Sequence, residues 1–504
     1  MAWTLSARLM SGEAASVRIP PDSLIEDLRK LAQIELKKSL KAVTSSTTVL
    51  DPSSTIQAAG LKDGDEVGVI TAPKTKLRAH KFGFGFAAIM PDGTVEVWGH
   101  DLFLGNSRFD EAEQKDVLDV FLTETAVAAL RADGTVITCG SATDGGDSSS
   151  VKDLLKGIIH VEATQSAFAA LRADGTVVCW GSPSSGGDCG SVQNLLADVR
   201  RIYKSRSAFA AVTGSGAVIT WGDADCGGDS SSVKDLLADV REISATMSAF
   251  AAVTAKGAVI SWGCSEEGGD SSLVQQKLRG VSRVAASKRA FAAIRNDGSV
   301  VTWGDPEHGG DSTGVHERLM GVRSITASKA AFAATTVQCT IDATETGLNM
   351  AVKTGVVTWG DPDKGGQSGA ASDQLVDVRQ IACTGYAFAA LRSDGRVVVW
   401  GSARHGGDAS AVQEDLVDVK ELYASQSSFA ALRGDGRVIT WGHEDDGCDD
   451  PQLQKELVNI EQVCASKLSL AAVRSDGELV TWGDPEYGGH RTVDLSSRIL
   501  PSPF

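Results

Sequence analysis

The chain has 504 residues, of which 42% are hydrophobic, and its formal net charge is −17. This length exceeds what a single ordinary core supports, so we expect several domains or a repeat array. The acidic balance disfavours nucleic acid or an anionic membrane surface as the main partner. The sequence has no apolar run long enough to predict a membrane-spanning helix, and the first residues do not have the pattern of a signal peptide.

The cysteines indicate a reducing environment. The chain has nine of them, an odd number, and no two are spaced as Cys-x-x-Cys. A disulfide framework is therefore not expected. We predict a cytoplasmic or nuclear protein with reduced thiols.

Residues 1–72 differ from the rest of the chain and contain the first predicted elements. Alternating apolar residues predict strands, and apolar residues at helical spacing predict one amphipathic helix. The expected elements are strands at 3–9 and 15–19, a helix at 23–36, and short strands near 40–43, 48–50 and 66–70. This order is the plan of a small α+β domain of the β-grasp type.

Two phrases in this segment resemble ubiquitin-like domains: IEDLRKLAQ at 25–33 and TIQAAGLKDGDEV at 55–67. The resemblance covers residues 1–72 and implies a docking module. Ubiquitin ends in a diglycine that is conjugated to targets, whereas here Ile70 runs on to Pro73 without a Gly-Gly pair. The segment is therefore expected to be a built-in module and not a conjugated tag. The alternative is a β-grasp fold with no ubiquitin-related role.

Ten copies of one motif fill residues 82–490, after a linker or possible closing strand at 73–81 and before a C-terminal tail at 491–504. Each copy ends in tryptophan, or once in cysteine, followed by glycine. Successive ends are 41 residues apart, except for one interval of 56. Such a fixed period is typical of repeat architectures. The ends are Trp98, Cys139, Trp180, Trp221, Trp262, Trp303, Trp359, Trp400, Trp441 and Trp482.

One copy illustrates the expected secondary structure. Strands are predicted at 419–424, 428–433 and 437–441, with Gly436 in an Asp-Gly turn between the last two. A glycine recurs at this turn in all ten copies, because the turn needs a positive φ. A large apolar residue, usually phenylalanine, precedes each repeat end at a fixed spacing, and we expect it to form the inter-repeat core with the tryptophan. Short helices such as 149–155 are expected after the Gly-Gly-Asp-Ser loops.

The phrase DGxVxxWG, followed by a loop with glycine, resembles the regulator-of-chromosome-condensation repeat over residues 76–490. The resemblance implies a mostly β fold in which ten copies form a β-propeller-like toroid. Here the family's Gly-Gln-Leu-Gly loop is Gly-Gly-Asp-Ser, and its Gly-x-x-His segment is Ala-Ser-x-Ser-Ala-Phe. Because propellers usually have about four to eight blades, an open solenoid is the alternative.

The sequence shows no catalytic or metal-binding constellation, so we expect no enzyme activity, no cofactor and no metal. The loop after each Trp-Gly varies between copies while the strands do not, which makes these loops candidates for partner binding. The alternative is drift on a solvated rim. The candidate residues are Asp223, Asp225, Glu266, Glu267, Asp305, Glu307, His308, Asp361, Asp363, Lys364, Arg404, His405, His443, Glu444, Asp484, Glu486 and Tyr487.

We therefore expect a non-enzymatic scaffold or adaptor that binds proteins through its repeat loops and carries a ubiquitin-like docking module. The resemblances leave two alternatives open: a regulatory subunit of a ubiquitin ligase or proteasome pathway, and a guanine-nucleotide exchange factor for a small GTPase. The expected partners are proteins, which include ubiquitin-pathway components or a small GTPase. A membrane is not expected among the partners, and nucleic acid is disfavoured.

Two further expectations concern the geometry of the repeats. The 15 extra residues at about 336–350 should extend one hairpin that projects from the body, as a partner-binding arm or as a harmless insertion. If the repeats close into a ring, residues 74–79 should pair with the tenth repeat, because unpaired strand edges invite aggregation.

Overall fold

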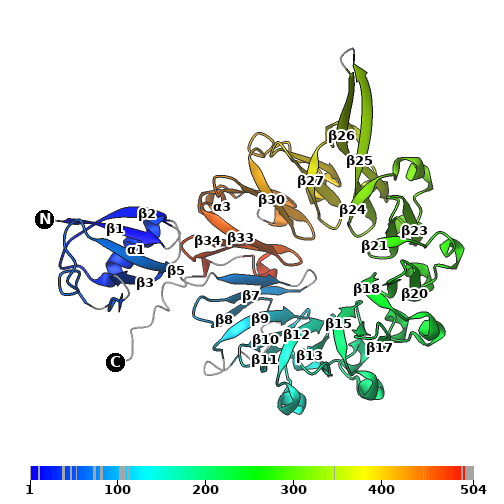
Figure 1. Cartoon of the computed structure of the whole chain (residues 1–504), viewed down its shortest axis with the longest axis horizontal. Helices are drawn as coiled ribbons and strands as arrows, with labels where there is room; N and C mark the ends of the chain where they lie inside the picture. Colours follow the sequence, from blue (N-terminus) through cyan, green and yellow to red (C-terminus); the bar gives the residue numbers. More distant parts are fainter. Residues whose placement is uncertain are drawn as a thin grey trace.

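The computed structural model describes residues 2–9, 12–36, 40–45, 48–52, 54–71, 75–79, 83–100, 109, 114–344, 347–446, 448, 450–489 and 492–493. The chain forms a small N-terminal unit and a ring of ten β-sheets (Figure 1). No helix within these ranges is long and apolar enough to cross a membrane.

The N-terminal unit is a five-stranded sheet with one helix. Its elements are β1 (Trp3–Leu9), β2 (Ala14–Ile19), α1 (Ile25–Leu36), β3 (Leu40–Ser45), β4 (Thr48–Val49) and β5 (Glu66–Thr71). The sheet order is β2-β1-β5-β3-β4, in which β1 and β5 are parallel and the other neighbours are antiparallel. Ile25, Leu28 and Ala32 recur at helical spacing and are buried with the sheet residues Leu5 and Val67. The result is a β-grasp fold with a core of its own.

Each sheet of the ring is a blade whose strands follow one another in chain order. Blades 1 to 5 comprise β6 (Lys76–Ala79), β7 (Gly85–Ile89) and β8 (Val95–Gly99); β9 (Val117–Leu122), β10 (Ala126–Arg131) and β11 (Val136–Gly140); β12 (Ile158–Ala163), β13 (Ala167–Arg172) and β14 (Val177–Gly181); β15 (Val199–Lys204), β16 (Ala208–Thr213) and β17 (Val218–Gly222); and β18 (Val240–Ala245), β19 (Ala249–Thr254) and β20 (Val259–Gly263).

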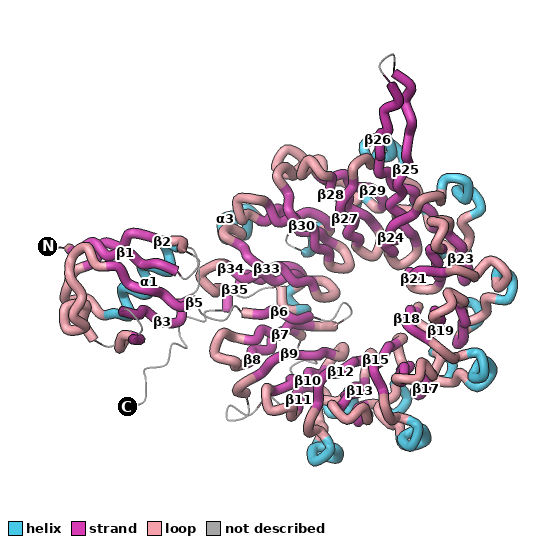
Figure 2. Tube along the Cα trace, viewed as in Figure 1, coloured by secondary structure: helices cyan, strands magenta, loops and turns pink. Residues whose placement is uncertain are grey.

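Blades 6 to 10 repeat the same plan. They comprise β21 (Val281–Ala286), β22 (Ala290–Arg295) and β23 (Val300–Gly304); β24 (Val322–Ala327), β25 (Ala331–Thr344) and β26 (Gly347–Gly360); β27 (Val378–Cys383), β28 (Ala387–Arg392) and β29 (Val397–Gly401); β30 (Val419–Ala424), β31 (Ser428–Arg433) and β32 (Val438–Gly442); and β33 (Ile460–Ala465), β34 (Ser469–Arg474), β35 (Leu479–Gly483) and β36 (Thr492–Val493). The first strands of neighbouring blades lie side by side around the axis of the ring (Figure 2).

Blade 4 shows why the repeat sequence folds into this unit. Gly216 makes the turn from β16 to β17 with a φ of +79°. The two strands pair so that Phe209 lies opposite Trp221, and the two rings stack with their centroids 5.2 Å apart. The Trp221 indole N–H donates to the Gly186 carbonyl at 3.0 Å, in the loop that leaves the preceding blade. The stacked pair therefore joins the blade to the loop before it, and the same indole bond recurs in blades 3 to 9. The expected inter-repeat core is confirmed.

Most repeat ends are followed by two short helical segments. The first, in the variable loop, is η1 (Ala142–Asp144), η3 (Pro183–Ser185), η5 (Ala224–Cys226), η7 (Ser265–Glu267), η9 (Pro306–His308), η11 (Pro362–Lys364), η13 (Ala403–His405), η14 (Glu444–Asp446) or η15 (Pro485–Tyr487). The second, in the linker to the next blade, is η2 (Ser149–Leu154), η4 (Gly190–Leu195), η6 (Ser231–Leu236), η8 (Ser272–Val274), η10 (Thr313–Arg318), η12 (Gly369–Gln374) or α3 (Pro451–Glu456). The short linker helices expected from the sequence are present, and all but α3 are 3-10 helices.

The ring closes between blade 10 and blade 1. Leu77 and Trp98 of blade 1 are buried in one cluster with Ala471 of blade 10, and the Leu77 N–H donates to Gln462 Oε1 at 3.3 Å. The expectation that residues 74–79 pair with the tenth repeat is wrong, because β6 pairs with β7 inside blade 1 while β36 pairs with β35. Since blade 1 already has its three strands, closure needs only the face-to-face packing that joins the other blades. The repeats therefore form a toroid and not an open solenoid.

The extra residues of the seventh repeat lengthen one hairpin, as expected. β25 and β26 pair without a break from Ala331 opposite Gly360 to Thr344 opposite Gly347. The hairpin projects outward from the ring (Figure 1). The additional backbone therefore does not disturb the blade below it.

Blade 2 lacks the stacked pair. Val127 lies opposite Cys139 in the positions that phenylalanine and tryptophan occupy in blade 4. Phe109, from the segment between blades 1 and 2, is buried in the same cluster as both residues. The Gln114 side-chain amide donates to the Phe109 carbonyl at 2.9 Å. Phe109 therefore supplies aromatic volume that the repeat positions of blade 2 lack.

Blade 3 contains a disulfide between Cys179 and Cys189, whose Cα atoms are 6.0 Å apart. In blade 4 the same two positions are Thr220 and Ser230, whose hydroxyl groups are hydrogen bonded at 3.0 Å. The same bond joins Thr138 to Ser148 and Thr302 to Ser312, each at 3.0 Å. The expectation of reduced thiols is wrong for this pair, because the fold brings two positions ten residues apart within disulfide range.

Candidate functional site: the loop face of the ring

The variable loops and the turns between first and second strands share one face of the ring. In blade 4 the Asp223 N–H donates to the Ser207 carbonyl at 3.0 Å, and in blade 6 the Asp305 N–H donates to the Arg289 carbonyl at 3.0 Å. The equivalent pairs are His100–Phe84, Ser141–Thr125, Ser182–Ser166, Cys264–Ser248, Asp361–Ala330, Ser402–Tyr386, His443–Ser427 and Asp484–Leu468. We call the surface made by these turns and the loops that follow them the loop face.

In blades 2 to 8 a buried hydroxyl group holds the loop to its turn. In blade 4, Ser205 Oγ accepts the Ala208 N–H at 3.1 Å and donates to the Cys226 carbonyl at 2.8 Å. The same donation to a loop carbonyl joins Thr123 to Asp144, Thr164 to Ser185, Thr246 to Glu267, Ser287 to His308, Ser328 to Lys364 and Thr384 to His405. This contact gives a structural reason for the Ser or Thr in the Ala-Ser-x-Ser-Ala-Phe motif. The loop backbone is thereby held the same way in different blades.

One residue of each turn joins a hydrogen-bonded belt around the axis. The Arg206 N–H donates to the Met247 carbonyl at 3.0 Å, and the Met247 N–H donates to the Lys288 carbonyl at 3.0 Å. The belt begins at the Phe84 N–H in blade 1 and reaches Lys467 in blade 10. We call the following belt members the axial residues: Glu124, Gln165, Arg206, Met247, Lys288, Lys329, Gly385, Gln426 and Lys467.

Several of the residues predicted as partner-binding have a structural task. Asp223, Asp305, Asp361 and Asp484 each begin a 3-10 segment, and each carboxylate accepts the N–H two residues on, at 2.9 to 3.0 Å. An aspartate in this position closes a local turn. These four residues therefore shape their loops, whatever else they contact.

The residues that follow them are exposed. Asp225, Glu266, Glu307, Asp363, Arg404, Glu444 and Glu486 all lie at the outer surface of their loops. Six of these seven carry a carboxylate. The outer part of the loop face is accordingly acidic.

Arg289 forms ion pairs with residues of two neighbouring loops that the sequence predicts to be partner-binding. Its guanidinium forms ion pairs with Glu267 at 3.0 Å and with Asp305 at 3.0 Å. His308 Nδ1 also lies 3.0 Å from the Asp305 carboxylate. In the next loop Lys364 pairs with Asp361 at 2.6 Å. The carboxylates of Glu267, Asp305 and Asp361 are therefore neutralised by ion pairs, and Arg289 links the first two of these loops to each other.

Aromatic residues meet on blades 8 and 9. The rings of Tyr386 and His405 are 4.4 Å apart, and those of His405 and His443 are 5.7 Å apart. Burial lowers the pKa of His405, and the neighbouring positive groups of His443 and Arg404 lower it further. His405 is thereby biased toward its neutral form, in which one ring nitrogen accepts a hydrogen bond.

A second aromatic group lies where blade 10 meets blade 1. The Phe84 ring is 5.3 Å from that of Tyr487 and 5.9 Å from that of His100. The Lys467 ammonium group lies 4.8 Å from the Phe84 centroid and 5.7 Å from that of Tyr487. The predicted residue Tyr487 therefore belongs to a cluster that the sequence does not reveal, since its members come from both ends of the repeat array.

The axial residues are the functional candidates that the sequence reasoning missed. They occupy the variable position of the Ala-Ser-x-Ser-Ala-Phe motif, three residues before the repeat phenylalanine. Their recurrence at this spacing was the available signal, but only the ring shows that they meet. Gln165 contacts both of its neighbours, since its amide donates to Glu124 at 2.7 Å and its carbonyl accepts from Arg206 at 2.6 Å.

Basic side chains predominate among the charged axial residues. Arg206, Lys288, Lys329 and Lys467 are basic, and Glu124 is the acid among them. Burial lowers the pKa of Lys329; the Tyr386 hydroxyl opposes this effect, and the ammonium groups of Lys288 and Lys467 add to it. Burial also disfavours the charged form of Glu124 and so raises its pKa. The loop face thus has a basic centre inside an acidic periphery.

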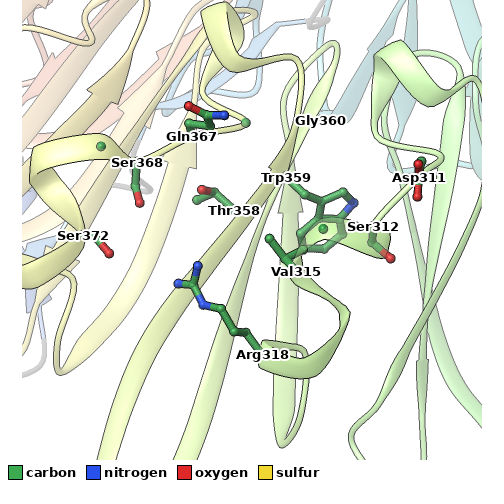
Figure 3. Close-up of a pocket in the computed structure, with 13 residues that line it drawn as sticks. Asp311, Ser312, Val315, Arg318, Thr358, Trp359, Gly360, Gln367, Ser368 and Ser372 are labelled. Atoms are coloured by element: carbon green, nitrogen blue, oxygen red, sulfur yellow. The ribbon is translucent and has the colours of Figure 1, made fainter.

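Among the described residues, no group of three or more His, Cys, Asp or Glu side chains is placed to hold a metal ion. A pocket of about 470 Å³ lies between the linker after blade 6 and strand β26, with Asp311, Arg318 and Trp359 among its lining residues (Figure 3). Asp311 accepts the Thr313 N–H at 2.8 Å and so closes the linker turn. We therefore assign the pocket no function.

Comparisons with known proteins support the repeat type. The sequence pattern of the Regulator of chromosome condensation (RCC1) repeat matches residues 378–406, which contain blade 8. No curated protein matches the chain.

Solved structures with partial similarity include human WBSCR16, at 16% identity over 48% of this chain and 79% of that protein, with a TM-score of 0.30. Another is Prp20p from Saccharomyces cerevisiae, at 14% identity over 58% of this chain and 73% of that one, with a TM-score of 0.30. Its structure was described together with binding to Gsp1p and histones. The N-terminal segment is similar to a ubiquitin from Caldiarchaeum subterraneum, at 17% identity over 14% of this chain and 96% of that one, with a TM-score of 0.14. Blade 8 thus matches the RCC1 repeat pattern, and the other blades of the ring share its order of strands.

Proposed function

We propose that this protein is a non-enzymatic scaffold that binds protein partners through the loop face. The proposal depends on one observation: the loops have a backbone held by recurring hydrogen bonds but exposed side chains that differ between blades. The backbone N–H bond of the first loop residue recurs in all ten blades and the buried hydroxyl group in blades 2 to 8, as Asp223 and Ser205 show in blade 4. Both hold the loop backbone in place. The exposed residues beside them change from Asp225 to Glu266 to Arg404. A fixed frame with changing exposed residues is suited to recognition.

The N-terminal unit is proposed as a ubiquitin-like docking module. Its mixed sheet, with parallel central strands β1 and β5 and the single helix α1, supports this assignment. Its core is formed by its own residues, including Leu5, Leu28 and Val67, so it is able to present a surface independently of the ring. On this proposal the module connects partners held by the ring to the ubiquitin pathway, in the cytoplasm or nucleus.

The test is partner capture by the full chain in cells, using proximity labelling. The loop variant carries Glu266→Arg, Glu307→Arg and Asp363→Arg, three exposed acids of the loop face. Its matched control carries the same charge change at Asp153, Asp235 and Glu414, which are exposed on the linkers between blades.

We expect the loop variant to lose partners that the wild type and the control both label. Equal labelling by all three proteins would contradict the proposal. A nucleotide-release assay with small GTPases tests the exchange-factor alternative, and a chain that begins at residue 73 tests which partners depend on the N-terminal module.

A further inference from the structure

We propose that the basic axial residues form a binding site for an acidic segment of a protein partner. The carboxylates of that segment would lie at the centre of the loop face, against Lys288, Lys329, Lys467 and Arg206. The inference rests on the proposed function and names the chemistry of the partner for the same face.

The belt places these cations together on a fixed backbone. Lys288 donates its N–H to the Lys329 carbonyl at 3.1 Å, so two lysines lie on adjacent blades. Lys467 is three blades further along the same belt, which runs from Lys329 through Gly385 and Gln426. The side chains of separate blades therefore share one region near the axis.

Aromatic rings hold two of the lysines in place. The Lys329 ammonium lies 4.8 Å from the Tyr386 centroid and donates to the Tyr386 hydroxyl at 3.3 Å. Lys467 lies over Phe84 in the same way, at 4.8 Å. A cation over an aromatic face is oriented but keeps its full charge. These contacts position the ammonium groups and do not neutralise them.

The three axial lysines form no ion pair with any carboxylate in the described part of the chain, whereas Lys204 pairs with Glu162 at 3.3 Å and Lys364 with Asp361 at 2.6 Å. Like charges held close together repel one another, and an anion that enters between them removes that cost. Glu124 is the acid among the axial residues, and the positive groups of Lys467 and Arg206 act on its carboxylate. Four axial cations thus face one axial carboxylate, and in a chain with a net charge of −17 this local excess of cations suits an anion from outside.

The charge around the cluster selects the kind of anion. Asp225, Glu266, Glu307 and Glu486 are exposed on the surrounding loops. A long polyanion such as nucleic acid would cross this acidic periphery and be repelled by it. A short acidic protein segment contacts only the basic centre and does not cross the acidic periphery. Basic residues that flank this segment in the partner would complement the acidic loops. Charge complementarity therefore favours a protein segment over nucleic acid.

The probe is a fluorescent octaglutamate peptide, and its binding to the full chain is measured by anisotropy over a range of salt concentrations. The test variant carries Lys288→Gln, Lys329→Gln and Lys467→Gln. The matched control removes the same charge at Lys152, Lys234 and Lys277, which are exposed on the linkers. A third protein has arginine at the three axial positions, which keeps the charge and checks that the ring tolerates substitution there.

We expect the glutamine variant to bind octaglutamate at least about tenfold more weakly than wild type, with a flatter salt dependence, because fewer charges are engaged. The linker control and the arginine variant should stay within about twofold of wild type. No binding by wild type at low salt, or equal losses in the glutamine variant and the linker control, would overturn the proposal. So would preferential binding of an oligothymidylate of equal charge.

The two proposals fail separately. If octaglutamate does not bind but Glu266→Arg, Glu307→Arg and Asp363→Arg still abolish partner labelling, the acidic-segment site is wrong and the scaffold function stands. If neither the lysine variant nor the loop variant changes labelling, both proposals are wrong.

Discussion

Blade 4 and blade 2 fill the same inter-blade space by different routes. In blade 4 the space is filled from within the repeat by Phe209 and Trp221, and the indole bonds to the Gly186 carbonyl. In blade 2 the repeat supplies only Val127 and Cys139, and Phe109 of the preceding segment is buried beside them. The comparison teaches that a departure from the repeat sequence does not imply a cavity. A residue outside the repeat pattern compensates for it.

Two other blades follow the same rule. In blade 3 the threonine and serine of the usual hydrogen bond are both replaced, and Cys179 and Cys189 are joined covalently. In blade 9 the usual alanine before the phenylalanine is Ser428, and its hydroxyl donates to the buried Asp446 carboxylate. In these examples a change at one position is matched by a change at its neighbour.

The largest expected effect is that of Trp221→Ala, which removes the centre of the blade 4 interface. Truncating a buried aromatic residue costs about 3–5 kcal/mol of unfolding free energy. The same change at Cys139 should cost only about 1 kcal/mol, because far less apolar area is lost. Urea denaturation of both variants, with native-state hydrogen exchange on residues 208–222 and 126–140, measures the difference. Equal losses would show that the stacked pair is not the main inter-blade contact.

Phe109→Ala should destabilise blade 2 by about 3 kcal/mol, since the side chain is almost fully buried. Adding Cys139→Trp to this variant should restore part of the loss, because the new indole enters the space that Phe109 leaves. In the wild-type background Cys139→Trp alone should be destabilising through overpacking, by about 1–3 kcal/mol. A double-mutant cycle by urea denaturation measures the coupling. Additive effects would mean that Phe109 does not occupy the tryptophan site.

Reduction of the disulfide in blade 3 should lower stability by about 2–3 kcal/mol, the range for a short closed loop. The variant Cys179→Thr with Cys189→Ser restores the hydrogen-bonded pair of blade 4. The stability of this variant should not change with reductant, and its free energy of unfolding should lie between those of the oxidised and the reduced wild type. Urea denaturation with and without dithiothreitol measures this order. A double variant less stable than reduced wild type would show that the blade has adapted to cysteine.

Gly186→Ala should cost about 2 kcal/mol, because the new methyl group would meet the Phe209 ring at 2.6 Å in a residue with a φ of +90°. Gly477 has a similar φ of +92° but open space around its Cβ position. Gly477→Ala should therefore cost about 1 kcal/mol, for backbone strain alone. The difference, measured by thermal or urea unfolding, isolates the close packing between loop and blade. No difference would assign the cost at Gly186 to its backbone conformation.

The smallest effect is a pH dependence in blade 9. Burial raises the pKa of Asp446, and hydrogen bonds from Ser427 and Ser428 oppose that shift. A carboxyl group with a raised pKa in the folded state stabilises the fold at acidic pH, and this contribution is lost as pH rises through the folded pKa. The stability of the wild type relative to Asp446→Asn should therefore decrease between pH 4 and pH 7. Urea denaturation across this range checks the sign, and an increase would mean that hydrogen bonding outweighs burial.

Much of the fold is determined by residues that are close together in the sequence. The 41-residue period, the turn glycine and the spacing between Phe209 and Trp221 determine the hairpins and their register, because all of these contacts form within one repeat. For the same reason the first two strands of blade 9 match their expected bounds and the third begins one residue later, and the hairpin of β25 and β26 is located correctly. The seventh copy is the exception: a turn at Gly355 is wrong there, because the inserted residues continue both strands and Gly355 pairs with Thr336 inside the hairpin. Alternating and helical patterns likewise placed the β-grasp elements.

Only the tertiary structure decided how the repeats meet. Closure of ten blades depends on the small rotation between neighbours added around the ring, which no single repeat encodes. That closure brings Tyr487 beside Phe84. The belt around the axis brings Lys329 and Lys467, 138 positions apart in the sequence, onto the same face of the ring. The sequence does not reveal the roles of Phe109 and the Cys179–Cys189 pair for a related reason. A repeat pattern shows which residue is missing from a position, but only the packed structure shows which neighbour replaces it.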